Sequence, residues 1–259
     1  MESFWLALGM KALATTLVVV IASVVAERAG PKWGGLVASI PVSAGPAYVL
    51  LAFQHDAAFI ANSALTSFAS GAATWIFLIA FVRFSDRRKL WISLPSALLI
   101  WICTALVIRA VPWSWPLALG ANFIAFVAAV SWGIPQSGPI TKQISAARSW
   151  FELPLRALLV GVFVATVVML SNAIGPSATG IAAVFPIALT SLAFLINRGF
   201  GVAGAAAALG GAIKPMIGIA CGFAVLSLTP ELIGTWPALG LALFTALLWP
   251  MWIIARHKS

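Results

Sequence analysis

The sequence predicts an all-α transmembrane protein of nine helices, and three observations support this prediction. Of the 259 residues, 62% are hydrophobic and only 8% are charged, whereas soluble domains carry about 25% charged residues. The apolar residues form long runs, and the basic residues fall almost entirely in alternate connections between these runs. A chain so poor in charge cannot cover a water-facing surface, which excludes a soluble enzyme, a disordered protein and a nucleic-acid-binding module.

Nine apolar runs have the length of a membrane span, for which about 20 residues are needed. These runs are 4–26, 34–53, 59–82, 90–110, 115–132, 153–172, 179–197, 201–228 and 235–255. They use most of the chain, so we expect one transmembrane domain over residues 1–259. Its longest polar connection is a cytoplasmic loop at 133–152.

The basic residues orient this bundle. With nine spans, eleven of them fall on one side of the membrane: Arg28, Lys32, Arg83, Arg87, Arg88, Lys89, Lys142, Arg148, Arg198, Arg256 and Lys258. The opposite loops hold only Arg109. The positive-inside rule then places the N-terminus outside and the C-terminus in the cytoplasm, in a bacterial inner membrane. The basic loop 83–89 is expected to contact anionic lipid headgroups.

Tryptophans favour the same span boundaries. Those near the ends of the predicted helices are Trp5, Trp33, Trp91, Trp113, Trp115, Trp132, Trp150, Trp236 and Trp252. Tryptophan is enriched at membrane interfaces, so these residues predict an interfacial belt.

An internal repeat relates the two ends of the chain. An offset of 145 residues superimposes Trp5 on Trp150, Gly30 and Pro31 on Gly175 and Pro176, Gly35 on Gly180, and Pro41 on Pro186. The first repeat covers about 4–110, the second about 150–255, and 115–132 is a linker helix without a counterpart. Five helices separate equivalent positions, so the second copy would insert upside down. Such inverted repeats are common in secondary transporters.

The twin Gly-Pro, Gly and Pro pattern resembles that of small bacterial polytopic membrane proteins. In the second half of those proteins the entry is similar to residues 152–156 of this chain, which read Glu-Leu-Pro-Leu-Arg. The resemblance implies an integral membrane protein, but it implies no particular reaction or substrate.

Two hydrophobic segments at corresponding positions are interrupted by proline. The first segment carries Pro41, Ser43, Gly45 and Pro46, and the second carries Pro186, Thr190 and Ser191. Proline removes a backbone donor and frees a carbonyl about four residues earlier, and in lipid these groups need protein or water partners. The pair therefore predicts a substrate-lining site, and simple kinks for helix packing are the alternative.

One helix face and one lysine add to this site. Asn62, Thr66, Ser70 and Thr74 share a face of the helix at 59–82, because they are spaced four residues apart. The counterpart helix has Gly210, Lys214, Gly218 and Gly222 at that spacing. Close helix packing explains the glycines, but it does not explain the lysine.

Lys214 lies roughly 20 Å from the start of its run at a rise of 1.5 Å per residue. No Asp or Glu lies at that depth in the sequence, so the lysine predicts a neutral amine, a water-filled cavity or an anionic ligand. A lysine bonded to carbonyls freed by Pro215 is the alternative.

Three further residues carry weaker signals. Lys11 and Arg156 are equivalent in the repeat and could mark the mouths of an anion path, although interfacial anchoring explains them as well. His55, next to Asp56 in a predicted outer loop, is typical of a solvated loop.

These features predict a secondary transporter that moves a small anion by alternating access. We expect no enzymatic activity, no cofactor, no metal and no nucleic-acid partner, with the lipid bilayer as environment and a homodimer left open. The alternatives are a flippase for an anionic lipid and a non-catalytic membrane assembly subunit. An intramembrane enzyme would need convergent acid–base or nucleophilic groups, which the sequence does not show.

Overall fold

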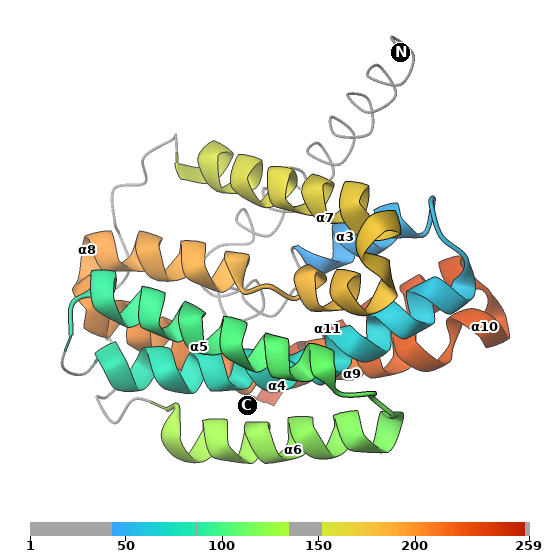
Figure 1. The fold of residues 1–259 in the computed structure, drawn as a ribbon. Coiled ribbons are helices and arrows are strands. Elements are labelled where there is room, and N and C mark those ends of the chain that lie inside the picture. The colour runs from blue at the N-terminus through green and yellow to red at the C-terminus, as the bar shows by residue number, and fades with distance from the viewer. Residues whose placement is uncertain (1–42, 86–87, 135–151, 257–259) are drawn as a thin grey trace, which may run out of the picture.

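A computed structural model describes residues 43–85, 88–134 and 152–256 (Figure 1). These residues are helical apart from short turns, and no strand occurs among them. The helices are α3 (Ala44–Leu51), α4 (Ala57–Ser85), α5 (Leu90–Ala110), α6 (Trp115–Trp132), α7 (Glu152–Ala183), α8 (Ile187–Ala212), α9 (Ile217–Leu228), α10 (Pro230–Ile233) and α11 (Thr235–Arg256).

Several helices are long and apolar enough to cross a membrane. Five stretches in the described chain meet that criterion, or six if the bent pair formed by α8 and α9 counts as one span. The chain is thus an all-helical protein with the build of a multi-pass membrane protein. Predicted spans at 59–82, 90–110, 115–132 and 235–255 correspond closely to α4, α5, α6 and α11. The span at 4–26 and most of 34–53 lie outside the described residues, so the total of nine and the orientation stay predictions.

Two predicted spans are not continuous helices. The run 179–197 is interrupted at 184–186, where α7 ends and α8 begins, and this break falls at Pro186 as the proline pattern predicts. The run 201–228 is also broken, because the chain bends by 45° between Ile196–Ala212 and Ile217–Leu228. Pro215 lies in this second break and cannot donate a backbone hydrogen bond.

Glycines with positive φ bend two of the helices further. Gly175 has φ 76° inside α7 and Gly201 has φ 69° inside α8. This left-handed region is readily open only to glycine. As a result α7 and α8 each consist of two straight pieces that run in different directions.

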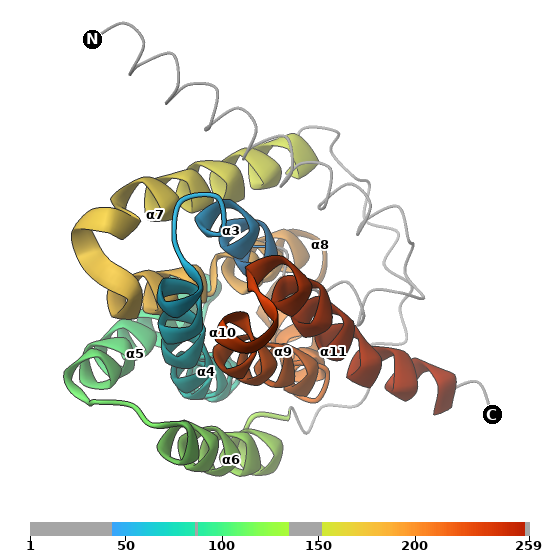
Figure 2. The same cartoon turned by 90° about the vertical axis from the view of Figure 1, so that its right-hand side faces the viewer.

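Helix α4 is the centre of the bundle (Figure 2). It packs against α5, α6, α7, α8 and α9, and 78% of its most apolar window is buried, against 22% in both α6 and α11. Large side chains on the outer helices, such as Phe123 and Phe244, are exposed. In a bilayer these outer faces would contact lipid.

Small residues allow this close packing. A Cβ atom added to Gly180 of α7 would overlap with the carbonyl oxygen of Ser63 in α4. Gly218 and Gly222 of α9 similarly approach the carbonyls of Ala246 and Ala242 in α11. The predicted role of these last two glycines in helix packing is confirmed.

Three of the described cations lie together at one end of the bundle. Arg83, Arg88 and Lys89 are exposed where α4 gives way to α5. Trp91 contacts Phe194 of α8 with 5.9 Å between ring centroids, so the first piece of α8 passes beside the start of α5. Arg109 lies at the far end of α5, away from this group.

The contact between α7 and α4 leads to a stability prediction. Gly180→Val places a branched side chain against the Ser63 carbonyl, and such overpacking costs about 1–3 kcal/mol. We expect a lower midpoint of thermal unfolding for the purified protein in detergent. The control is Gly120→Ala on α6, where an added Cβ meets nothing within 4 Å; equal midpoints for the two variants would contradict this contact.

Candidate functional site

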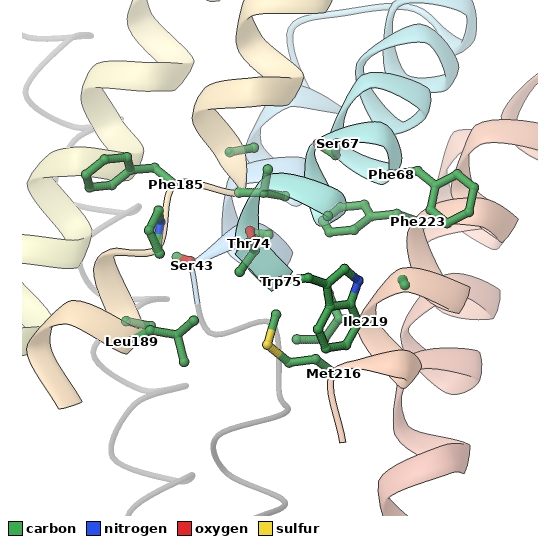
Figure 3. A pocket seen from close by; sticks show the side chains of 17 residues that line it. Ser43, Ser67, Phe68, Thr74, Trp75, Phe185, Leu189, Met216, Ile219 and Phe223 are labelled. Carbon is green, nitrogen blue, oxygen red and sulfur yellow. The ribbon is translucent and has the colours of Figure 1, made fainter. Parts of the chain in front are cut away.

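A cavity of about 90 Å³ lies in the core where the helix breaks meet α4 (Figure 3). Residues from α3, α4, the α7–α8 break and the α8–α9 break line it: Ser43, Ala44, Ser67, Phe68, Gly71, Thr74, Trp75, Ala183, Val184, Phe185, Pro186, Ala188, Leu189, Met216, Ile219, Ala220 and Phe223. No residue in this described lining is charged.

Three helices begin at the cavity. Their N-cap residues are Ser43 for α3, Pro186 for α8 and Met216 for α9, and all three line it. The first N–H groups of a helix have no acceptor within the helix and point toward its N-terminus. None of the three N-caps makes a side-chain capping hydrogen bond. The cavity therefore borders three helix N-termini, which are sources of partial positive charge from the backbone.

The three helix starts are not equally open. In α9, the N–H groups of Ile217 and Gly218 donate to the carbonyls of Lys214 and Pro215. In α8, the N–H of Ile187 donates to the Phe185 carbonyl over 2.7 Å and that of Thr190 to the Pro186 carbonyl over 2.8 Å, so only Ala188 and Leu189, which both line the cavity, remain as early amides of that helix.

An aromatic wall stands beside the α7–α8 break. The ring of Phe185 lies 5.2 Å from Trp101 in α5 and 5.4 Å from Phe163 in α7, measured between centroids. These contacts hold the unwound segment 184–186 against neighbouring helices and make this side of the cavity apolar.

Helix α4 provides the polar part of the lining. Ser67, Gly71, Thr74 and Trp75 face the cavity from successive turns. Trp75 is 2% exposed, and its ring lies among Met216, Ile219 and Phe223 (Figure 3). Its indole Nε1 has no hydrogen-bond partner in the described part of the chain, although a buried donor usually has one.

A hydrogen-bond chain joins three helices beside the cavity. The Ser67 hydroxyl donates to the Gly180 carbonyl of α7 over 2.7 Å. The Ser67 proton is thereby used, so the 2.8 Å contact between Ser67 Oγ and the Tyr48 hydroxyl of α3 must be donated by the tyrosine. This chain fixes α3 and α7 to α4.

Removing the middle of this chain has a measurable cost. Ser67→Ala leaves two buried groups, the Tyr48 hydroxyl and the Gly180 carbonyl, without their partner, and a loss of about 1–3 kcal/mol of stability is expected. Thermal unfolding in detergent measures it. Ser63→Ala is the matched control, because the Ser63 hydroxyl is buried in α4 without a partner among the described residues; a control that unfolds as early as Ser67→Ala would contradict the hydrogen-bond chain.

The structure brings some of the predicted proline-segment residues to the cavity. Ser43 and Pro186 line it, whereas Gly45 and Pro46 lie in the first turn of α3 and are not in the described lining. Thr190 and Ser191 instead bond to backbone carbonyls of their own helix and are not in the described lining. Pro41 lies outside the described residues.

The predicted polar face of α4 is turned mostly away from the cavity. Asn62 is exposed and bonds to the Ala58 carbonyl, whereas Thr66 and Ser70 are buried but absent from the lining. Thr74 alone of that face reaches the cavity. The lining face passes through Ser67 and Gly71 because α7 and α9 cross α4 on that side.

Lys214 occupies a different place from the one the sequence favours. It lies in the turn 213–216 between α8 and α9, and its side chain is exposed and not in the described lining. Its carbonyl accepts a 2.9 Å hydrogen bond from Trp249 Nε1. Of the other predicted cations, Lys11 lies outside the described residues, and Arg156 lies near the start of α7.

The positions of three tryptophans in the sequence could have indicated where the cavity lies. Three tryptophans lie away from the predicted helix ends, and all three adjoin the breaks: Trp75 lines the cavity, Trp101 packs on Phe185, and Trp249 bonds to Lys214. A tryptophan in mid-span needs a buried partner for its N–H. Mid-span tryptophans therefore indicate this region better than the serine and threonine spacing does.

His55 is part of a structural link at the end of the bundle, away from the cavity. Its Nε2 lies 2.7 Å from the buried Ser171 Oγ, which itself donates to the Val168 carbonyl, so the histidine is the donor. Its ring also stacks on Phe59 at 3.6 Å. Burial lowers the pKa of His55 below its usual value, and the Asp56 carboxylate opposes that shift.

The lowered pKa predicts a pH dependence of stability. Below about pH 6.5, the usual histidine pKa, the unfolded chain binds a proton more readily than the folded one, so stability falls as the pH falls. His55→Gln keeps an N–H donor but does not titrate. Between pH 7 and pH 5 its thermal midpoint should fall less than that of the unmodified protein; identical pH profiles would show that His55 contributes nothing to the profile.

Comparison with protein-family models, curated proteins and solved structures finds no match to this chain. Its fold and site describe an all-helical protein built like multi-pass membrane proteins, with broken helices around a neutral core cavity.

Proposed function

We propose that the protein is a secondary transporter that moves a small anion by alternating access and binds it in the core cavity. The observation that carries this proposal is the convergence of the α3, α8 and α9 N-termini on that cavity. Transporters with discontinuous helices bind anionic groups at such half-helix N-termini near the bilayer midplane.

The positive potential of this site comes from backbone dipoles. Each helix N-terminus carries roughly half a positive charge, and in a buried site such a charge is little screened. An anion can therefore be bound without a lysine or arginine. The prediction of an anionic substrate rested on Lys214, but these helix N-termini support it on separate grounds.

Movable parts surround the site. Helices α7 and α8 each contain a positive-φ glycine, Gly175 and Gly201, outside the break at 184–186. Short helical pieces joined at such points can change their relative angle without disturbing the straight α4. This arrangement supports a mechanism in which the pieces open the cavity alternately to the two sides.

Helix boundaries also agree with the proposed repeat. The 145-residue offset carries α5 (Leu90–Ala110) onto 235–255, and α11 spans Thr235–Arg256. The offset carries α4 onto 202–230, which contains the second piece of α8 and all of α9. Correspondingly, α4 packs against α5 and α9 packs against α11. These correspondences favour two structurally related halves.

Uptake into proteoliposomes tests the proposal. The labelled probes are chloride, phosphate, sulfate and benzoate, with uptake into protein-free vesicles subtracted. We expect uptake of at least one probe, reduced about tenfold by Pro186→Ala, because alanine restores the backbone donor and allows α7 to continue into α8.

Pro95→Ala is the matched control, since Pro95 lies inside α5 and is exposed away from the cavity. It should transport like the unmodified protein. The proposal is wrong if no probe is taken up, or if Pro186→Ala and Pro95→Ala transport equally well.

A further inference from the structure

Lys214 places a charge on the surface of the bundle, near the middle of a bent span. It lies in the turn between Ile196–Ala212 and Ile217–Leu228, which together can count as one span, and its side chain is exposed. Within the described chain, no residue forms an ion pair or a hydrogen bond with its ammonium. A charge at membrane depth is costly unless it is paired or extends to the interface. The surface around Lys214 therefore favours an anionic partner.

Three side chains of α11 form a row that begins beside this lysine. Trp249 Nε1 donates a 2.9 Å hydrogen bond to the Lys214 carbonyl, and the Trp249 ring stacks on Trp252 with 5.0 Å between centroids. The Arg256 guanidinium lies over the Trp252 ring, 4.1 Å from its centroid. Residues three or four positions apart share one face of a helix. Two cations, Lys214 and Arg256, thus lie at the two ends of an aromatic pair.

The separation of these cations suits one phosphate group. From Trp249 to Arg256 the rise along α11 is about 10 Å, and a lysine side chain can extend along an apolar surface toward the headgroup level. Arg256 is the last residue of α11, and the end of this helix extends beyond the other described helices (Figure 2). A phosphate accepts charge-assisted hydrogen bonds at several oxygens. It can therefore bond to the ammonium and the guanidinium at the same time.

Apolar surface adjoins this pair of cations. Leu248 shares a helix face with Trp252 and is 48% exposed. Gly211 is exposed one turn before Lys214, and a Cβ atom added to it would meet nothing within 4 Å. A hydrocarbon chain can thus lie against α11 and the end of α8. The cation pair and the apolar surface together match the two parts of a phospholipid, whereas free phosphate would use only the cations.

We propose that an anionic phospholipid binds at this surface, with its phosphate between Lys214 and Arg256 and an acyl chain along Trp249, Trp252 and Leu248. The lipid holds the outer side of the α8–α9 break, whose inner side lines the core cavity. This site goes beyond the proposed function and does not depend on it, because the transported anion would bind in the cavity.

Binding of tritium-labelled phosphatidylglycerol to the purified full-length protein in detergent tests the proposal. The competitors are unlabelled phosphatidylglycerol, zwitterionic phosphatidylcholine and inorganic phosphate. Unlabelled phosphatidylglycerol should compete at least about fivefold better than phosphatidylcholine, and inorganic phosphate at the same concentration should not compete.

Variants test the two cations. Lys214→Gln and Arg256→Gln should each weaken phosphatidylglycerol binding about fivefold, since one cation beside an anionic headgroup contributes roughly that factor. Lys214→Arg keeps the charge and should bind like the unmodified protein. Lys89→Gln is the matched control, because it removes an exposed cation at the start of α5; it should leave the affinity unchanged.

Four results would overturn the proposal. Equal competition by phosphatidylcholine would show that the lipid charge is not recognised, and displacement by inorganic phosphate would replace the lipid with a free anion. An unchanged affinity in both Lys214→Gln and Arg256→Gln would place the lipid elsewhere. An equal loss in Lys89→Gln would indicate a general effect of net charge. None of these results bears on anion uptake by the proteoliposomes, so the proposed function is judged separately.

Discussion

A helix that ends inside a bilayer leaves N–H and C=O groups without partners, and lipid cannot satisfy them. This constraint decides where the breaks of this protein lie. The α7–α8 break, the α8–α9 break and the start of α3 all border the same core cavity, and the outer side of the α8–α9 break is bonded to Trp249 of α11. The interrupted helices α7, α8 and α9 therefore all pack against the continuous helix α4.

Helix α4 can take that central position because its side chains are small where its neighbours cross it. Gly180 of α7 packs closely against Ser63 and Ser67. Gly71 lies so near Asn122 of α6 that a Cβ atom added to the glycine would collide with the side-chain amide oxygen of Asn122. The helix is therefore held by backbone proximity and by hydrogen bonds such as the Tyr48–Ser67–Gly180 chain. Large apolar side chains contribute more at its far end, where Phe77, Leu78 and Phe81 are fully buried.

The described charged side chains lie apart from the core cavity. Described cations such as Arg83 and Lys89 lie at one end of the bundle, where they suit anionic headgroups. The core cavity contains no charged side chain among its described residues, and its positive potential comes from helix N-termini. Release of the proposed anion from such a site would break no strong ion pair.

The sequence by itself determined the apolar helices and one of the breaks. The bounds of α5 and α6 agree with the runs 90–110 and 115–132 because Lys89, Pro112 and Gly133 mark the turns around these helices, and Pro186 predicted the end of a helix for a local covalent reason. Local chemistry could not determine which face of α4 borders the cavity, because Ser, Thr, Gly and Ala occur all around that helix. It also could not show that Lys214 turns outward or that Trp75 turns inward. Those directions depend on how α7 and α9 cross α4, which residues distant in the sequence decide together, and so only the tertiary structure settled them.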